Sequence, residues 1–121
     1  MMGQSDEHRE RRRGHLRARP ASPVDGVRGF LRTYSSDALT DEEMFGDIAR
    51  VAAVSPRSLV VALDSLEAFL ADPPRDGSVA RLVAEDANRQ LEDPSEAGSL
   101  RWLRETADRL RTILGQLPRN D

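Results

Sequence analysis

Apolar residues recur at spacings of three and four along most of the chain, which is the pattern of helices that bury one face. Five such segments are present: 24–34, one that follows Thr40, one between Ser55 and Asp72, 79–91, and 99–114. No segment shows the two-residue alternation typical of a half-buried strand. The sequence therefore predicts an all-α fold, a small single-domain bundle of about five helices.

Cap and turn residues mark where several of these helices begin and end. Thr40 and Glu43 have the spacing of a capping box, in which each side chain bonds a backbone N–H near the other residue. Ser55 and Pro56 predict a second start, with serine as the cap and proline at the first helical position. The prolines at 73 and 74 then end that helix.

The helix between Ser55 and Asp72 has the strongest apolar stripe in the chain. We expect it to bury Leu59, Val60, Leu63, Leu66, Phe69 and Leu70. Trp102 lies beside the leucine stripe of the last helix, so packing at the margin of the core is its predicted role. The alternative for Trp102 is an exposed anchor at a binding interface.

Charge divides the chain into two unlike regions. Residues 1–22 contain six arginines and three acidic residues, a net of +3, and the remainder carries −6 because the whole chain carries −3. The basic segment has almost nothing apolar beyond Leu16, so we predict that 1–22 is a disordered Arg-rich tail. The helical domain is expected over 23–117, followed by a C-terminal tail at 118–121.

Residues suited to catalysis or to metal binding are scarce. The chain has no cysteine, and its two histidines, His8 and His15, both lie in the predicted tail. There is no phosphate-binding glycine loop and no serine elbow, so we expect no catalytic residues, no metal and no cofactor, and we expect that the protein is not an enzyme. No apolar run approaches the roughly 20 residues that span a bilayer, which excludes a membrane partner and makes the cytoplasm the expected compartment.

The order of several motifs resembles the immunity proteins of bacterial contact-dependent growth inhibition systems. The resemblance covers about 27–114 and rests on Phe30-Leu31-x-x-Tyr34, Asp37, Ser55-Pro56, Leu63-x-x-Leu66-Glu67-Ala68-Phe69-Leu70-Ala71, Asp93-Pro94, Gly98 and Leu100-Arg101-Trp102-Leu103. It implies a small helical protein that binds the toxic C-terminal domain of a cognate toxin and neutralises it by covering its active site. An acidic body of net −6 would be attracted to the basic cleft of a nuclease toxin, with carboxylates in the place of substrate phosphates.

Seven acidic residues are the candidates for binding the toxin. They form one group near the first interhelical gap and another along the leucine-rich helix: Asp37, Asp41, Glu42 and Asp47, then Asp64, Glu67 and Asp72. Two other functions stay open: a nucleic-acid-associated regulator or antitoxin that uses the basic tail, and an adaptor that dimerises through the helix at 99–114. The tail lacks aromatic residues that could stack on bases and the body is acidic, so nucleic acid is the less favoured partner. The sequence sets neither the oligomeric state nor the activity of the toxin.

Overall fold

The computed structural model describes residues 22–117, and in this part of the chain every regular element is helical. The elements are α2 (Pro23–Tyr34), α3 (Asp41–Val54), α4 (Arg57–Ala71), α5 (Ser78–Arg81), the π-helical turn η1 (Leu82–Asp86) that continues α5 without a break, and α6 (Glu96–Gly115). This confirms the predicted all-α fold with about five helices. The tails predicted at 1–22 and 118–121 lie outside the described residues, except that Ser22 belongs to the domain, because its side chain caps α2.

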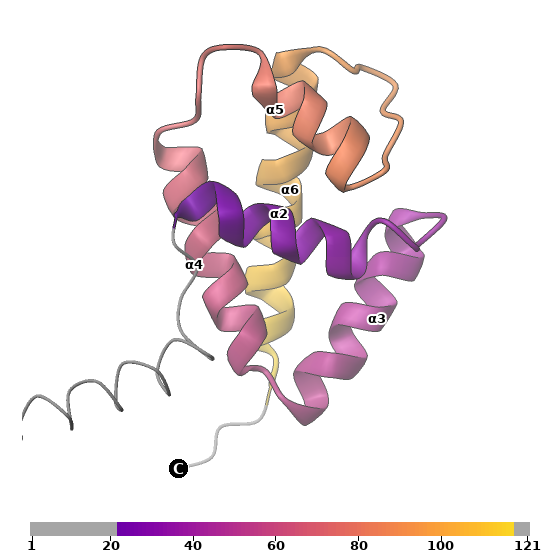
Figure 1. Ribbon diagram of the computed structural model, residues 1–121. Coiled ribbons are helices and arrows are strands. Elements are labelled where there is room, and N and C mark those ends of the chain that lie inside the picture. Colours follow the sequence, from indigo (N-terminus) through magenta and orange to yellow (C-terminus); the bar gives the residue numbers. More distant parts are fainter. Residues whose placement is uncertain (1–21, 118–121) are drawn as a thin grey trace, which may run out of the picture.

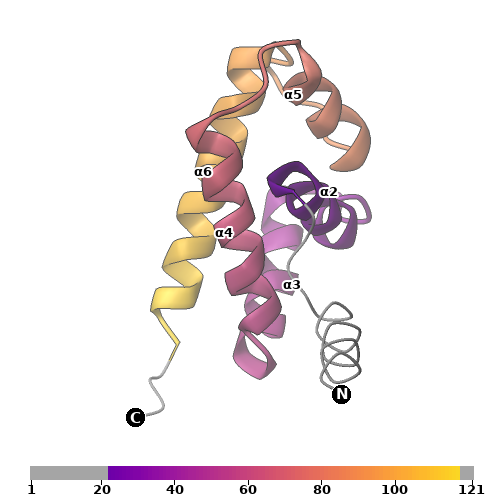
Figure 2. The same ribbon diagram turned by 60° about the vertical axis from the view of Figure 1, so that its left-hand side comes forward.

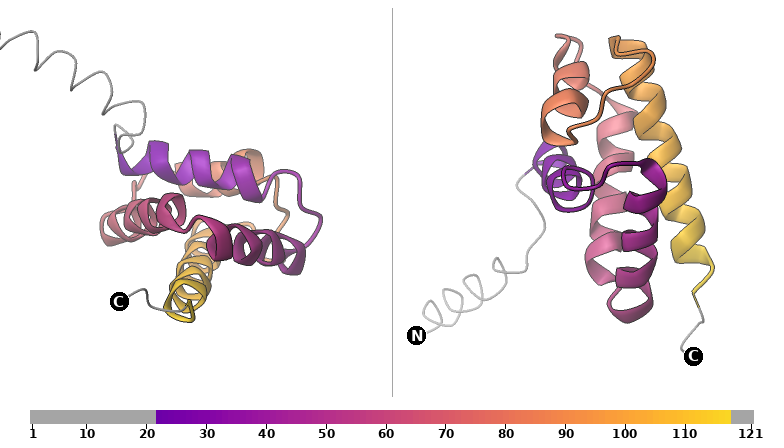
Figure 3. Two further views of the ribbon diagram at one scale, coloured as in Figure 1. Left: turned by 90° about the horizontal axis from the view of Figure 1, so that it is seen from below. Right: turned by 90° about the vertical axis from the view of Figure 1, so that its right-hand side faces the viewer.

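The helices are arranged in layers. Helices α4 and α6 lie side by side and run in opposite directions, as Figure 2 shows most clearly. Helix α2 crosses the front of α4 (Figure 1). Helix α3 begins near the C-terminal end of α2, runs downward in this view, and connects to α4 through a tight turn. Seen from below in Figure 3, α2 forms one layer, α3 and α4 the next, and α6 the last. None of the helices in the described part is long and apolar enough to cross a membrane.

The core lies between these layers and is built mainly from aliphatic side chains. Each long helix contributes residues that are fully buried: Val27 and Leu31, Met44 and Ile48, Leu59 and Leu66, and Leu103 and Leu110. Their spacings of four and seven are those of the predicted apolar stripes. Trp102 is 7% exposed and packs in this core, which confirms the predicted role.

The capping box at the start of α3 is present, with one difference. The Thr40 hydroxyl accepts from the backbone N–H of Glu43 at 3.1 Å, as predicted. The Glu43 carboxylate accepts instead from the N–H of Leu39, at 2.7 Å, one residue earlier than expected. These two bonds therefore fix the backbone of Leu39, the residue before the cap, as well as the start of α3.

The start of α4 differs from the prediction. Ser55 does not cap the helix, because Pro56 occupies the cap position and no side chain accepts from the first N–H groups. Val60 is 46% exposed, whereas Ala62 and Ser65 are buried on the inner face. The error in the stripe arose because a run of apolar residues does not show which of two neighbours faces inward.

The helix predicted over 79–91 ends five residues early. Beyond Arg81 the backbone widens into π-type bonding, with the Ala87 N–H donating to the Leu82 carbonyl at 3.2 Å. Asn88 then adopts a positive φ of 54°, a conformation that asparagine tolerates better than most residues. Leu91 therefore lies outside the helix, although it still packs against the core.

The last helix begins earlier than predicted, at Glu96 instead of Ser99. The Ser95 hydroxyl caps it by accepting from the Gly98 N–H at 3.1 Å. The Glu96 carboxylate accepts from the N–H groups of Val79 and Ala80 at 3.2 and 2.9 Å, and so caps α5 from a different helix. The prediction missed this start because the apolar stripe itself begins only at Leu100.

Candidate functional site

The segment between α2 and α3 carries the clearest candidate surface. Residues 35–40 leave α2 at Ser35 and enter α3 at its Thr40 cap, at the right-hand side of the molecule in Figure 1. Three of the seven acidic candidates, Asp37, Asp41 and Glu42, lie in or directly after this segment, and Asp47 lies one to two turns farther along α3. The conformation of this loop therefore determines where most of the first predicted acidic group lies on the surface.

Residues beyond η1 hold this loop from behind. The buried Ser35 hydroxyl donates to the Ala87 carbonyl at 2.8 Å. The Asn88 side-chain amide donates to the Ser36 carbonyl at 3.2 Å, and Arg89 donates to the Ala38 carbonyl at 3.2 Å. Three successive residues thus bond a loop that is about fifty positions away in sequence, which restricts its backbone to one conformation.

Arg89 also joins the loop to Asp41 of α3, which in turn bonds α6. Its side chain is 10% exposed, and its Nε lies 3.2 Å from Oδ1 of Asp41. The Trp102 indole N–H donates to the other carboxylate oxygen of Asp41 at 3.3 Å. The carboxylate of Asp41 is thus turned toward the protein, between a guanidinium and an indole, and serves to position the loop.

Leu39 has the opposite environment. Its side chain is 84% exposed at the turn into α3, although its backbone N–H is bonded to Glu43. A leucine directly before a helix cap commonly packs on the fourth helical residue, which here is Met44. Met44 is fully buried without it, and Ala38 fills the adjacent buried position. Leu39 is therefore an apolar side chain that the fold holds in place but does not cover.

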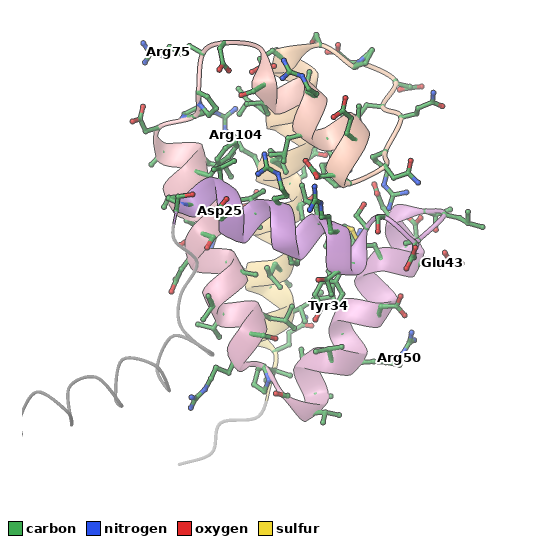
Figure 4. All side chains as sticks on the ribbon, viewed as in Figure 1. Asp25, Tyr34, Glu43, Arg50, Arg75 and Arg104 are labelled. Atoms are coloured by element: carbon green, nitrogen blue, oxygen red, sulfur yellow. The ribbon has the colours of Figure 1, made fainter. Side chains whose placement is uncertain are left out.

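Two carboxylates flank this leucine and have no partner of their own. Asp37 and Glu42 are exposed, and within residues 22–117 neither forms a hydrogen bond or an ion pair. Glu43, labelled beside the loop in Figure 4, is in contrast used by the capping box. We call Asp37, Leu39 and Glu42 the loop patch.

The remaining acidic candidates do not join the loop patch. Asp47 pairs with Arg50 one turn along α3, and Glu67 pairs with Arg111 of α6 at 3.1 Å. The bonds from Glu67 and Asp108 raise the pKa of Arg111 above its ordinary value. Asp64 and Asp72 are exposed on α4 and at its end. That end of α4 and the α2–α3 loop lie on opposite sides of Figure 1, so the seven residues do not form one surface.

Sequence reasoning missed the apolar member of the patch and the residues that hold it. Leu39 was available as a signal, because it is a large apolar residue between an aspartate and a helix cap, outside either helical stripe. Asn88 and Arg89 give no signal, since the predicted helix over 79–91 includes them, whereas the structure ends that helix at Asp86. Their role depends on a tertiary contact with residues 35–38.

Within residues 22–117 no cluster of three or more histidine, cysteine or acidic residues is arranged to hold a metal ion, and both histidines lie outside this range. The loop patch offers two free negative charges and one apolar side chain on a fixed backbone. Comparisons with protein-family models, with curated proteins and with solved structures found no match.

Proposed function

We propose that this chain is an immunity protein that binds the toxic domain of a cognate contact-dependent growth inhibition toxin in the cytoplasm and covers its active site. The observation that carries the proposal is the loop patch, an exposed leucine between two unpaired carboxylates on a loop that is bonded by Ala87, Asn88 and Arg89, directly after η1. The resemblance of the motifs over 27–114 to this class of protein supplies the identity of the partner.

Fixing the loop before binding favours a tight complex. A partner that binds a mobile loop must offset the entropy lost when that loop is ordered. Here the bonds from Ser35, Asn88 and Arg89 restrict the backbone in the free protein. An apolar anchor on such a backbone is the kind of side chain that contributes most to binding, while charges around it steer association and set specificity.

The charge of the domain matches a basic partner. Residues 23–121 carry −6, and Asp37 and Glu42 add their charge at the anchor without neutralisation by a nearby arginine. A nuclease domain has a basic cleft for its substrate, and these carboxylates would lie where phosphates otherwise bind. The bundle would then block access to the cleft without any chemical step, so the proposed protein is not an enzyme.

The test is a binding assay between the full chain and the C-terminal domain of the toxin-like protein encoded next to its gene. A tight one-to-one complex that abolishes toxicity in co-expression is the expected result. Absence of a complex would contradict the proposal. If the full chain instead retains DNA in a salt-dependent way, and residues 23–121 do not, the protein is a nucleic-acid-associated regulator.

The same assay locates the surface with a matched pair of variants. Leu39 and Val54 are each 84% exposed, but Val54 lies at the end of α3, away from the loop. Leu39→Ala is expected to weaken toxin binding at least tenfold, and Val54→Ala to leave it unchanged. Equal affinities of the two variants would remove the loop patch from the interface while leaving the immunity role intact.

A further inference from the structure

A cavity of about 580 Å³ opens between α2 and the first half of α4, apart from the loop patch. Its apolar wall comes from Phe30 and Tyr34 on α2 and from Val61 and Ala62 on α4. Figure 4 shows Tyr34 on the lower side of α2, in the space that α3 and α4 border. The volume is within the range of about 300–1,000 Å³ typical of sites for small molecules, and an apolar wall with few polar groups is their usual composition.

One polar group in this wall lacks a partner. Ser65 is 8% exposed and lines the cavity, yet within the described residues its hydroxyl forms no hydrogen bond. Other helical hydroxyls bond the carbonyl four residues earlier, as Thr33 of α2 does at 2.7 Å and Thr106 of α6 at 2.8 Å. The Ser65 hydroxyl is therefore a hydrogen-bonding group in a largely apolar wall, available to a polar atom in the cavity.

The start of α4 supplies positive charge at the edge of the same cavity. Arg57 is the first residue of the helix, lines the cavity, and has no ion pair within residues 22–117. The backbone N–H groups of Arg57 and Ser58 have no acceptor in the described part, because Pro56 provides no capping side chain. No acidic residue lies in the first turn to balance the positive end of the helix.

We propose that this cavity binds a small organic acid with one carboxylate, a site that lies beyond the proposed function. The carboxylate lies against Arg57 and the free N–H groups at the start of α4, where a helix N-terminus stabilises an anion. The apolar body lies between α2 and α4, where the Ser65 hydroxyl is available to a polar substituent if the ligand carries one. Asp25 also lines the cavity, and its carboxylate disfavours a ligand with a second negative charge.

The experiment is an NMR titration of the full chain with three probes of equal length: octanoate, octylamine and octanol. Tyr34 is the only tyrosine of the chain, so its ring signals report on the cavity without ambiguity. Octanoate is expected to shift these signals with a dissociation constant at least ten times lower than that of octylamine or octanol. Binding of all three with similar affinity, or no shift with octanoate, would overturn the proposal.

Two variants separate a specific site from general attraction to apolar surface. A Cβ added at Gly29, which lines the cavity, meets nothing within 4 Å, so Gly29→Leu adds a side chain to the cavity wall with room at its Cβ and is expected to abolish octanoate binding. Gly46 on α3 is equally open but does not line the cavity, so Gly46→Leu is the matched control. Arg57→Gln is expected to weaken octanoate binding about tenfold and to leave octanol unaffected. Unchanged octanoate binding by Gly29→Leu and Arg57→Gln would place the ligand elsewhere.

Discussion

Replacing Gly98 by alanine tests how tightly the start of α6 is packed. A Cβ at this position would lie 2.1 Å from the backbone oxygen of Asp93 and 2.6 Å from its Cγ, far closer than atoms approach in folded proteins. Asp93 has little freedom to move away. Its carboxylate accepts from the Ser95 N–H at 3.1 Å and from Arg101 at 3.0 Å.

The expected size of the effect follows from two opposing contributions. Alanine is favoured over glycine inside a helix by up to about 1 kcal/mol. A methyl group forced into a filled space costs about 1–3 kcal/mol, and the contact here is with backbone. Shifting Gly98 also disturbs the Ser95 cap, whose bond contributes about 0.5–2 kcal/mol. The net loss of unfolding free energy is expected to be about 1–3 kcal/mol.

Urea unfolding measures this loss, followed by the fluorescence of Trp102, the only tryptophan. Gly46→Ala is the control, because Gly46 lies inside α3 and a Cβ there meets nothing within 4 Å. That variant is expected to be more stable than the unmodified protein by about 0.5–1 kcal/mol. If Gly98→Ala unfolds at the same urea concentration as Gly46→Ala, the close approach to Asp93 is not a constraint and the reasoning is wrong.

Three further predictions concern stability. Asp41→Asn is expected to lower the unfolding free energy by about 1–2 kcal/mol, because the charge paired with the nearly buried Arg89 is lost. Glu42→Gln, the control, should change it by less than about 0.5 kcal/mol. Equal urea midpoints for the two variants would contradict this expectation. Hydrogen bonds from Ser95 hold the pKa of Asp93 below its ordinary value of 3.8, so the stabilisation is present above that pH and is lost as the pH falls through the lowered pKa. Asp93→Asn should therefore show a weaker pH dependence in acid urea titrations, and an unchanged dependence would exclude this contribution. Leu103→Ala, at a fully buried position, should cost about 2–5 kcal/mol and lower the thermal midpoint measured by circular dichroism, and a loss below about 1 kcal/mol would mean that the site collapses around the gap.

The parts of the fold that were predicted correctly are those set by local sequence. The apolar stripes of α2, α3 and α6 follow from helical spacing, and the Thr40 cap follows from a pattern four residues long. Such features depend on neighbours within one or two turns, so they can be deduced from the chain alone. The stop after Ala71 at the prolines is of the same kind.

Two of the errors concern residues that bond a partner distant in sequence. The segment 87–91 continues an apolar helical pattern, yet Ala87, Asn88 and Arg89 bond the loop at 35–38 instead of extending the helix. The apolar pattern predicts the last helix only from Ser99, whereas Glu96 is its first residue and its carboxylate caps α5. In the first case tertiary hydrogen bonds outweigh the local helical preference, and in both cases nothing in the local sequence identifies the distant partner.

The same cause explains why the binding surface could be predicted only in part. Asp37, Asp41 and Glu42 look equivalent in the sequence, as exposed acids around one interhelical gap. Arg89, which lies 48 positions beyond Asp41, separates them: it draws the Asp41 carboxylate inward and leaves the other two without partners. Because Arg89 also bonds the Ala38 carbonyl, one side chain both selects the free charges and fixes the backbone that carries Leu39. Loss of Arg89 should therefore change the position of Leu39 and of the charges beside it, even though Arg89 itself is nine-tenths buried. A binding surface of this kind depends on the residues behind it as much as on those that a partner touches.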